Sequence, residues 1–258
     1  MNLLPLPALS DNYIWLLHDG NNALVIDPGD AAPVLHALAH LGLRAAGIFI
    51  THHHADHCGG VPALHRATGA AVYAPAAERL PLQELPVQSV HDGDAFEALG
   101  LRWRALAVPG HTAGHVAYFT DEVQGAPLLF CGDALFSGGC GRIFEGTPAQ
   151  MLASLDALAA LPAATRVCAA HEYTLANLRF ARLVEPDNAA LAQHLVHCER
   201  LRAAGQPTLP STIGQELAIN PFLRSRTAAV VRAVQAASGC GADEVAVFAA
   251  LREWKNRT

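Results

Sequence analysis

The chain has 258 residues, a hydrophobic fraction of 52% and a formal net charge of -6 at pH 7. This length allows one large domain or two smaller ones with a substantial core. The negative charge and the lack of any long Lys/Arg cluster argue against a nucleic acid partner, because duplex binding depends on neutralising phosphates.

No apolar stretch approaches the roughly 20 residues that a membrane-spanning helix needs. The amino-terminal residues, MNLLPLPALSDNY, lack the basic segment and following apolar core of a secretory signal. We therefore expect an unexported, cytoplasmic protein with no membrane partner. Its six cysteines include no Cys-x-x-Cys pair, so we expect reduced thiols, with Cys58 as a small buried filler.

The first elements predicted are strands and one helix. Apolar runs at 14–17 and 23–26, separated by the turn-rich sequence HDGNN, indicate a hairpin. A helix is expected to begin near Asp30 and Pro33, because apolar residues follow at helical spacing. A third apolar run, at 48–50, indicates a buried strand.

Directly after this strand, the sequence THHHADH concentrates metal-capable side chains. His52 and His54 are two residues apart, so they can converge on one ion from an extended or looped backbone. Asp56 and His57, further into the same loop, can serve a second ion, and nitrogen and oxygen ligands suit zinc, iron or manganese. A solvated polar loop or histidines satisfied in the core are the alternatives, and the density of the cluster argues against both.

Strands and helices continue up to residue 171, and helices dominate beyond it. The elements predicted in the first part are a helix at 62–67, a strand at 70–74, an irregular stretch at 76–90, a hairpin of strands at 95–97 and 101–108, strands at 128–131 and 167–170, and a helix at 148–160 capped by Thr147. Those predicted in the second part are helices at 175–184, 189–204, 227–237 and 244–254, a linker at 205–211 and a short strand near 212–216. We therefore predict a catalytic domain at 1–171 and a helical, substrate-binding domain at 172–258.

Four predicted strands end just before a metal-capable residue. The strand at 48–50 precedes the histidine cluster, and the three strands ending at 108, 131 and 170 precede Pro-Gly-His111, Gly-Asp133 and His171. If neighbouring strands end along one edge of the sheets, these side chains meet in one cleft. Asp27 also follows a strand, where a carboxylate behind a metal ligand and a plain turn aspartate are both open.

The pattern Thr-His-x-His-x-Asp-His at 51–57 resembles the signature of the metallo-beta-lactamase superfamily. The resemblance implies an α+β fold, an αββα sandwich of two mixed β-sheets flanked by helices, followed here by the helical domain. The resemblance to members with two metals implies that His52, His54 and His111 bind the first ion. It implies that Asp56, His57 and His171 bind the second ion, and that Asp133 bridges both. Since His111 fills the ligand position, His115 is expected to have a structural role.

This ligand set implies hydrolytic chemistry. Two dications that share a bridging water lower its pKa from about 15.7 towards about 7, so a hydroxide nucleophile exists at neutral pH. One metal would stabilise the oxyanion that forms on the attacked carbonyl. Asp133 and Asp56 are the expected catalytic carboxylates, and steering the proton of the water is secondary to the ligand role of Asp56.

Motifs outside the ligand set resemble the glyoxalase II family, the hydroxyacylglutathione hydrolases, over essentially the whole chain. They are GDALF at 132–136, GCGRIFEGT at 139–147, HEYT at 171–174 with Asn177, Leu178 and Phe180, and LREWKN at 251–256. The resemblance implies hydrolysis of S-D-lactoylglutathione to D-lactate and glutathione, the second step of methylglyoxal detoxification. The family's glutathione contacts carry over to Arg142, Tyr173, Arg252 and Lys255. Arg252 and Lys255 share a helix face that can hold a carboxylate, and a solvated basic helix end is the alternative.

This sequence departs from the family pattern at two positions, which concern the affinity for the substrate more than the reaction. Arg142 stands where relatives often have lysine, and Phe144 where some have tyrosine, so one hydroxyl contact is absent. A persulfide dioxygenase with one iron, a beta-lactamase, a lactonase and a nuclease are rivals within the superfamily. A metal-binding protein without turnover is a rival outside it, but structural zinc sites are rich in cysteine, and no cysteine stands at a ligand position. We expect a monomer with two divalent ions, zinc first, with iron and manganese as alternatives.

Overall fold

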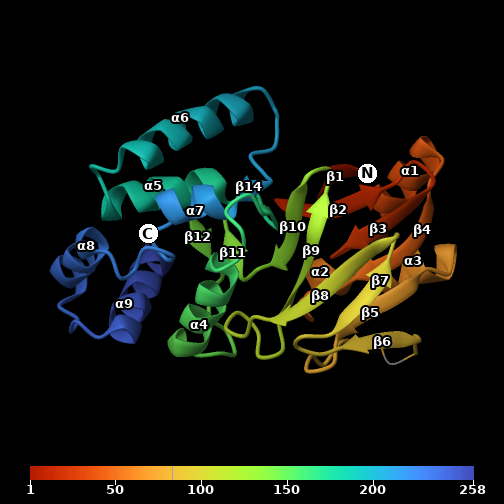
Figure 1. Cartoon of the computed structure of the whole chain (residues 1–258), viewed down its shortest axis with the longest axis horizontal. Helices are drawn as coiled ribbons and strands as arrows, with labels where there is room; N and C mark the ends of the chain where they lie inside the picture. The colour runs from red at the N-terminus through yellow and green to blue at the C-terminus, as the bar shows by residue number, and fades with distance from the viewer. Residues whose placement is uncertain (83) are drawn as a thin grey trace.

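The computed structural model describes residues 1–82 and 84–258. Two six-stranded β-sheets face each other, with helices outside the first sheet and a helical tail beyond the second (Figure 1). This arrangement confirms the predicted αββα sandwich with an added helical region. In the part of the chain that the structure describes, no helix is long and apolar enough to cross a membrane.

The first sheet has the strand order β1-β2-β3-β4-β5-β6. The strands are β1 (Asn2–Ala8), β2 (Asn12–His18), β3 (Asn22–Ile26), β4 (Arg44–Phe49), β5 (Ala71–Pro75) and β6 (Val87–Val90). The pairs from β1 to β3 are antiparallel and those from β3 to β6 are parallel. Parallel neighbours need crossovers, and these contain α1 (Ala31–Leu41), α2 (Ala55–Cys58) and α3 (Val61–Thr68). As predicted, Asp30 caps α1.

The second sheet has the order β14-β13-β10-β9-β8-β7. Its strands are β7 (Ala95–Ala98), β8 (Leu101–Ala107), β9 (Val116–Val123), β10 (Ala126–Gly132), β13 (Arg166–Ala169) and β14 (Ser211–Thr212). Among the described pairs of this second sheet, only β10–β13 is parallel. The crossover between these two strands holds the hairpin of β11 (Leu135–Phe136) and β12 (Gly139–Cys140), followed by α4 (Pro148–Ala159). Thr147 begins α4 with a capping box.

The side chains of β2 show why the sandwich closes. Successive strand residues point to opposite faces of the sheet. Trp15 belongs to the cluster between the sheets, together with Trp103 of the second sheet. Leu16 belongs to the cluster on the other face, which includes Val34 of α1. Both faces of β2 are therefore buried, which fixes the outward-facing helices and the second sheet on opposite sides of it.

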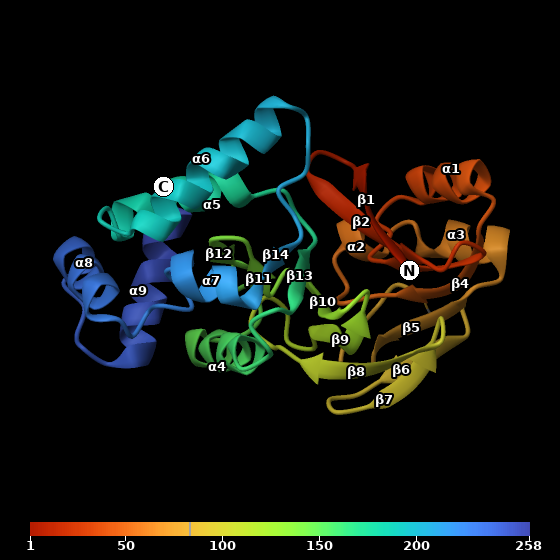
Figure 2. The same cartoon turned by 45° about the horizontal axis from the view of Figure 1, so that its top comes forward.

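The tail consists of helices that lie beside one another beyond the second sheet (Figure 2). They are α5 (Thr174–Val184), α6 (Ala189–Ala203), α7 (Ile213–Ile219), α8 (Ala228–Ser238) and α9 (Glu244–Asn256). The tail is not wholly helical, because β14 pairs with β13 and extends the second sheet.

Several sequence predictions need correction. The stretch 76–90 was predicted as irregular, yet it ends in β6, while residue 83 lies outside the described residues. The predicted strand near 212–216 is a two-residue strand followed by α7, whose first turn is capped by Thr212. Asp56 and His57 lie on the short helix α2 rather than in a loop. The strands β1, β9, β11 and β12 were not predicted.

Candidate metal centre

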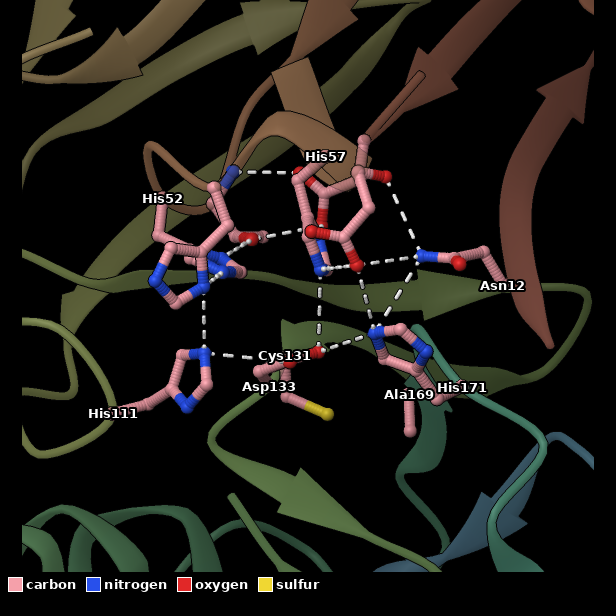
Figure 3. Close-up of polar contacts among 12 residues, drawn as sticks. Asn12, His52, His57, His111, Cys131, Asp133, Ala169 and His171 are labelled. Carbon is pink, nitrogen blue, oxygen red and sulfur yellow. Dashed lines mark hydrogen bonds and ion pairs between the residues drawn. The ribbon is translucent and has the colours of Figure 1, made fainter. Parts of the chain in front are cut away.

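The seven predicted ligands meet where four strands end. His52 and His54 follow β4, His111 follows β8, Asp133 follows β10 and His171 follows β13, while α2 presents Asp56 and His57. Figure 3 shows Asp133 between His111 and His171, with His52 and His57 on the opposite side. The strand-end rule therefore gathers all seven side chains at one edge of the sandwich.

Three imidazoles form the first group. His54 Nδ1 lies 3.0 Å from His52 Nε2 and 3.0 Å from His111 Nε2. Both partner nitrogens therefore point at the same spot. This convergence matches the predicted first set, and the three residues can hold an ion.

The second group shares Asp133 with the first. His171 Nε2 lies 3.3 Å from Asp133 Oδ1 and 3.4 Å from Asp56 Oδ2. His57 Nε2 lies 3.4 Å from the same Asp133 oxygen. The other oxygen of Asp133, Oδ2, lies 3.4 Å from His111 Nε2. Each oxygen of this carboxylate thus faces a different group, which is the placement that a bridging ligand needs.

The donor atoms fit two divalent cations. His57 Nε2 and Asp133 Oδ1 are buried and have no hydrogen-bond partner. Buried polar atoms normally have a partner, so unpaired acceptor atoms that converge on one point indicate a ligand. Imidazole nitrogens and carboxylate oxygens are suitable ligands for zinc, iron and manganese.

Each of four imidazoles is held through its second ring nitrogen. This nitrogen is Nδ1 in each ring. His57 Nδ1 lies 3.0 Å from Asp27 Oδ2, and His171 Nδ1 lies 2.7 Å from Asp11 Oδ1. His111 Nδ1 lies 2.8 Å from the Arg142 carbonyl oxygen, and His52 Nδ1 lies 3.0 Å from Thr51 Oγ1. Such partners set the tautomer, so that Nε2 presents its lone pair to the centre. Asp27 thus lies behind His57, a predicted ligand, which favours the first of the two roles left open by the sequence.

The electrostatics divide the cluster in two. Burial lowers the pKa of His54 and of His111, and lowers that of His52 well below its usual range. For His171 burial also disfavours the charge, but Asp133 and Asp56 outweigh it and raise the pKa to about 10. The pKa of Asp56 is lowered, mainly by its hydrogen bond with His171. The carboxylates therefore favour positive charge at the centre, as divalent ions would supply.

A cavity of about 730 Å³ opens on the cluster. The four residues predicted to bind substrate line it together with five side chains of the His/Asp cluster; they are Arg142, Tyr173, Arg252 and Lys255. Tyr173 stacks on His171 with the ring centroids 4.7 Å apart. Phe144, which is 62% exposed, meets His54 edge to face at the other side. Two aromatic rings thus flank the mouth of the metal centre.

Arg252 and Lys255 differ in their surroundings. Arg252 is only 7% exposed, its Nη1 donates to the Cys140 carbonyl at 2.7 Å, and its guanidinium lies over the Phe222 ring. Lys255 is half-buried, and burial together with Arg252 and Arg142 lowers its pKa. The ammonium of Lys255 is thus the freer of the two charges to meet an anionic ligand.

Sequence reasoning missed Asp11 and Asn12. Asp11 holds His171, and the Nδ2 of Asn12 donates to Asp56 Oδ2 at 3.1 Å. Asp11 lies in the turn before β2, and Asn12 is the first residue of that strand. They are 160 and 159 residues from His171 along the chain. Their sequence, SDNY, has no metal-ligand spacing, so no local signal indicates this role. His115 is buried, and its Nε2 accepts from the backbone N–H of Asp133 at 3.1 Å, which is a structural contact.

Comparisons with known proteins agree with this geometry. The family model of the metallo-beta-lactamase superfamily matches residues 9–171, and that of the hydroxyacylglutathione hydrolase C-terminus matches residues 172–258. The chain is 61% identical over 257 residues to the hydroxyacylglutathione hydrolase of Albidiferax ferrireducens, covering 100% of both chains. It is 56% identical to that of Cupriavidus taiwanensis, covering 98% of this chain and 97% of the relative.

Solved structures share the sandwich. The B3 metallo-beta-lactamase BLEG-1 aligns with a TM-score of 0.62 at 24% identity, covering 86% of this chain and 98% of that one. The di-iron-bound form of TTHA1623 aligns with a TM-score of 0.60 at 27% identity, covering 86% and 100%. With full-length relatives above 50% identity and matching family models for both regions, the chain belongs to the hydroxyacylglutathione hydrolases of the metallo-beta-lactamase superfamily.

Proposed function

We propose that this chain hydrolyses the thioester of S-D-lactoylglutathione and related S-2-hydroxyacylglutathiones, releasing the 2-hydroxy acid and glutathione. One observation carries the proposal. The cavity that holds the His/Asp cluster is also lined by three cationic side chains, Arg142, Arg252 and Lys255. A hydrolytic centre beside cations suits an anionic, glutathione-bearing thioester, and the family membership supports the same substrate.

The cluster would hold two divalent ions, and we propose zinc as the main metal. His52, His54 and His111 would bind the first, Asp56, His57 and His171 the second, and Asp133 both. When bound, such a pair supplies a water of lowered pKa and a Lewis acid for the thioester carbonyl.

The protein's own residues then orient and screen the reaction. Asn12 holds the carboxylate of Asp56 through Oδ2, and Asp11 and Asp27 hold the rings of His171 and His57. A fixed ring costs no reorganisation at the moment of reaction. Asp56, whose side chain is 39% exposed, would accept the proton of the attacking water as a role secondary to metal binding. The released thiolate is a good leaving group and needs little protonation.

Glutathione carries two carboxylates, and the cationic side of the cavity would bind them. The exposed Arg142 and the half-buried Lys255 would pair with these groups, with a charge-assisted hydrogen bond each. Tyr173, which stacks on His171, and Phe144, which meets His54, would lie beside the scissile bond and limit the access of bulk water to it. Lys255 and Arg142 would thereby fix the distance between the tripeptide and the metal centre.

We also propose that the enzyme acts as a cytoplasmic monomer, in the second step of methylglyoxal detoxification. All seven metal-binding side chains come from one chain, which needs no partner to complete the site. The six cysteines are unpaired, as a reducing compartment requires. Sedimentation of the metal-loaded protein at micromolar concentration should give the mass of one chain.

The direct test follows the absorbance of S-D-lactoylglutathione with purified, metal-loaded protein. We expect turnover that chelation abolishes and added Zn²⁺ restores, with two metals per chain. His54→Ala should lose turnover by at least about 100-fold, because two other ligand nitrogens converge on its Nδ1. Exposed His91→Ala is the matched control. Unimpaired turnover by His54→Ala, or one iron per chain with oxygen consumption, would overturn the proposal.

A further inference from the structure

We infer that the helical tail positions the metal centre by clamping the β11–β12 hairpin, in addition to lining the cavity. This inference deepens the proposed function and rests on it. The hairpin begins two residues after Asp133 and ends directly before Gly141 and Arg142. It therefore connects a bridging carboxylate with a residue of the cationic side of the cavity.

Five polar groups of the hairpin backbone are bound by side chains of the tail. Asn220 Nδ2 donates to the carbonyls of Phe136 at 3.1 Å and Gly139 at 2.9 Å. Asn177 Nδ2 donates to the carbonyl of Ser137 at 3.1 Å, and Arg252 Nη1 donates to that of Cys140 at 2.7 Å. The N–H of Gly138 donates to Glu216 Oε2 at 2.8 Å. These partners come from α5, from α7 and its C-cap, and from α9, so three parts of the tail hold one short hairpin.

The contact is also tight. Gly138 has a φ of +68°, and a Cβ there would lie 2.8 Å from Leu178 Cδ2. A Cβ on Gly139 would lie 2.6 Å from Asn177 Nδ2. The hairpin turn therefore fits against α5 with no room for a side chain, and it cannot shift towards the tail.

The hairpin passes this restraint on to both metal groups. At its start, the backbone N–H of Asp133 is held by His115, and its carboxylate faces His111 and His171. Past its end, the carbonyl of Arg142 accepts from His111 Nδ1 at 2.8 Å. A looser hairpin would thus leave both the position of Asp133 and the tautomer of His111 less fixed. Loss of a partner behind a metal ligand typically lowers metal affinity or activity by about 10–100-fold.

Asn220 is the residue that tests the clamp. It is 0% exposed and does not line the cavity. Its Nδ2 reaches two hairpin carbonyls and, at 3.1 Å, the Glu216 Oε2 that accepts from Gly138, so the loss of this donor acts on both tail partners of the hairpin turn. Asn220→Asp keeps the size and the acceptor for the Phe222 N–H, but it replaces the donor with an oxygen. Asn188→Asp is the matched control, because its Nδ2 donates to the Ala218 carbonyl within the tail and its Oδ1 caps α6.

The experiment uses the full, metal-loaded protein and three measurements. In Asn220→Asp we expect hydrogen exchange in peptides covering 134–142 to be at least about tenfold faster. We expect the chelator concentration that removes half of the bound metal to be about tenfold lower than for the natural protein. We also expect the fold decrease in kcat to be larger than the fold increase in KM. Asn188→Asp should match the natural protein in all three. If Asn220→Asp does not fold, Asn220→Ser replaces it in the experiment. This variant adds no charge and leaves one hydroxyl donor on a shorter side chain.

A folded Asn220 variant that keeps its metal and its hairpin exchange at the level of Asn188→Asp would overturn the inference. Hydrogen exchange and metal retention do not depend on the substrate. They therefore test the clamp even if the thioester proves to be the wrong substrate, so the two proposals can fail separately.

Discussion

The two ends of the active-site cavity are built in opposite ways. At the metal end, each of four imidazoles has a fixed partner behind it, and Asp133 joins the two groups. At the cationic end, Arg142 is exposed and Lys255 is half-buried, whereas Arg252 is committed to the hairpin and to Phe222. The comparison teaches that changes at the metal end should act on kcat, and changes at the cationic end on KM.

Replacing Asp133 should have the largest effect. Asp133→Asn keeps the size of the side chain but removes the charge that faces both groups. We expect kcat to fall by at least about 100-fold, because several kcal/mol of metal-derived stabilisation depend on the centre. Metal analysis should show fewer than two ions per chain. Two tightly held ions and a normal kcat would contradict the bridging assignment.

Replacing Asp27 should have a smaller effect at the same end. Asp27 Oδ2 lies 3.0 Å from His57 Nδ1 and accepts from Thr51 Oγ1 at 2.7 Å. Asp27→Asn is compatible with its φ of +54°, which asparagine tolerates. We expect a loss of about 10–100-fold in kcat or metal affinity, with KM little changed.

The matched control for this prediction is Asp30→Asn, three residues further along the chain. Asp30 caps α1 and does not contact the cluster, and asparagine is an equally good cap. Equal activity of the two variants would show that Asp27 is only a turn residue.

Sequence patterns brought the residues of the metal end together more directly than the rest of the site. Five of the seven residues predicted to bind metal follow strand ends, and a local rule about strand ends finds them wherever the strand itself is recognised. The support from Asp11 depends on a contact across 160 residues, which no spacing can indicate. The cationic end needed the family resemblance, because an i, i+3 pair such as Arg252 and Lys255 also fits a solvated helix end.

The fold shows the same division between local and long-range information. The β2–β3 and β7–β8 hairpins and the helices α1 and α4 were predicted correctly, because their turn and cap residues lie next to them in the sequence. β1 escaped notice because Pro5 and Pro7 fit only an edge strand, and its place at the edge comes from the tertiary structure. The stretch 212–216 was misread because Ser211 and Thr212 are extended only where they pair with β13, after which Thr212 caps α7.

Replacing Lys255 tests the expectation that the cationic end of the cavity acts on KM. Lys255→Ala removes one charge from the cavity without touching a metal ligand. We expect KM to rise by about tenfold, the low end for a charge-assisted hydrogen bond at a half-exposed position, with kcat nearly unchanged. Arg257→Ala, on the exposed side of the same helix end, is the control. An effect on kcat alone would contradict the division between the two ends.

The smallest effect is expected from pH. Burial, Arg252 and Arg142 lower the pKa of Lys255. A lysine is charged below its pKa, so KM should begin to rise at a lower alkaline pH than an ordinary lysine would give. Lys255→Arg keeps its charge throughout and should flatten this rise. Parallel KM profiles for the two proteins would assign the alkaline rise to another group.

The pairing of β14 with β13 also bears on how such a chain can be divided. Arg166 and Val167 pair with Thr212 and Ser211, so a strand from beyond the first four-fifths of the chain completes the second sheet. A chain cut after His171 would leave β13 with a free edge, where a second copy can pair and start aggregation. The tail is therefore no separable module, and exchanging it between enzymes requires a replacement for this one strand.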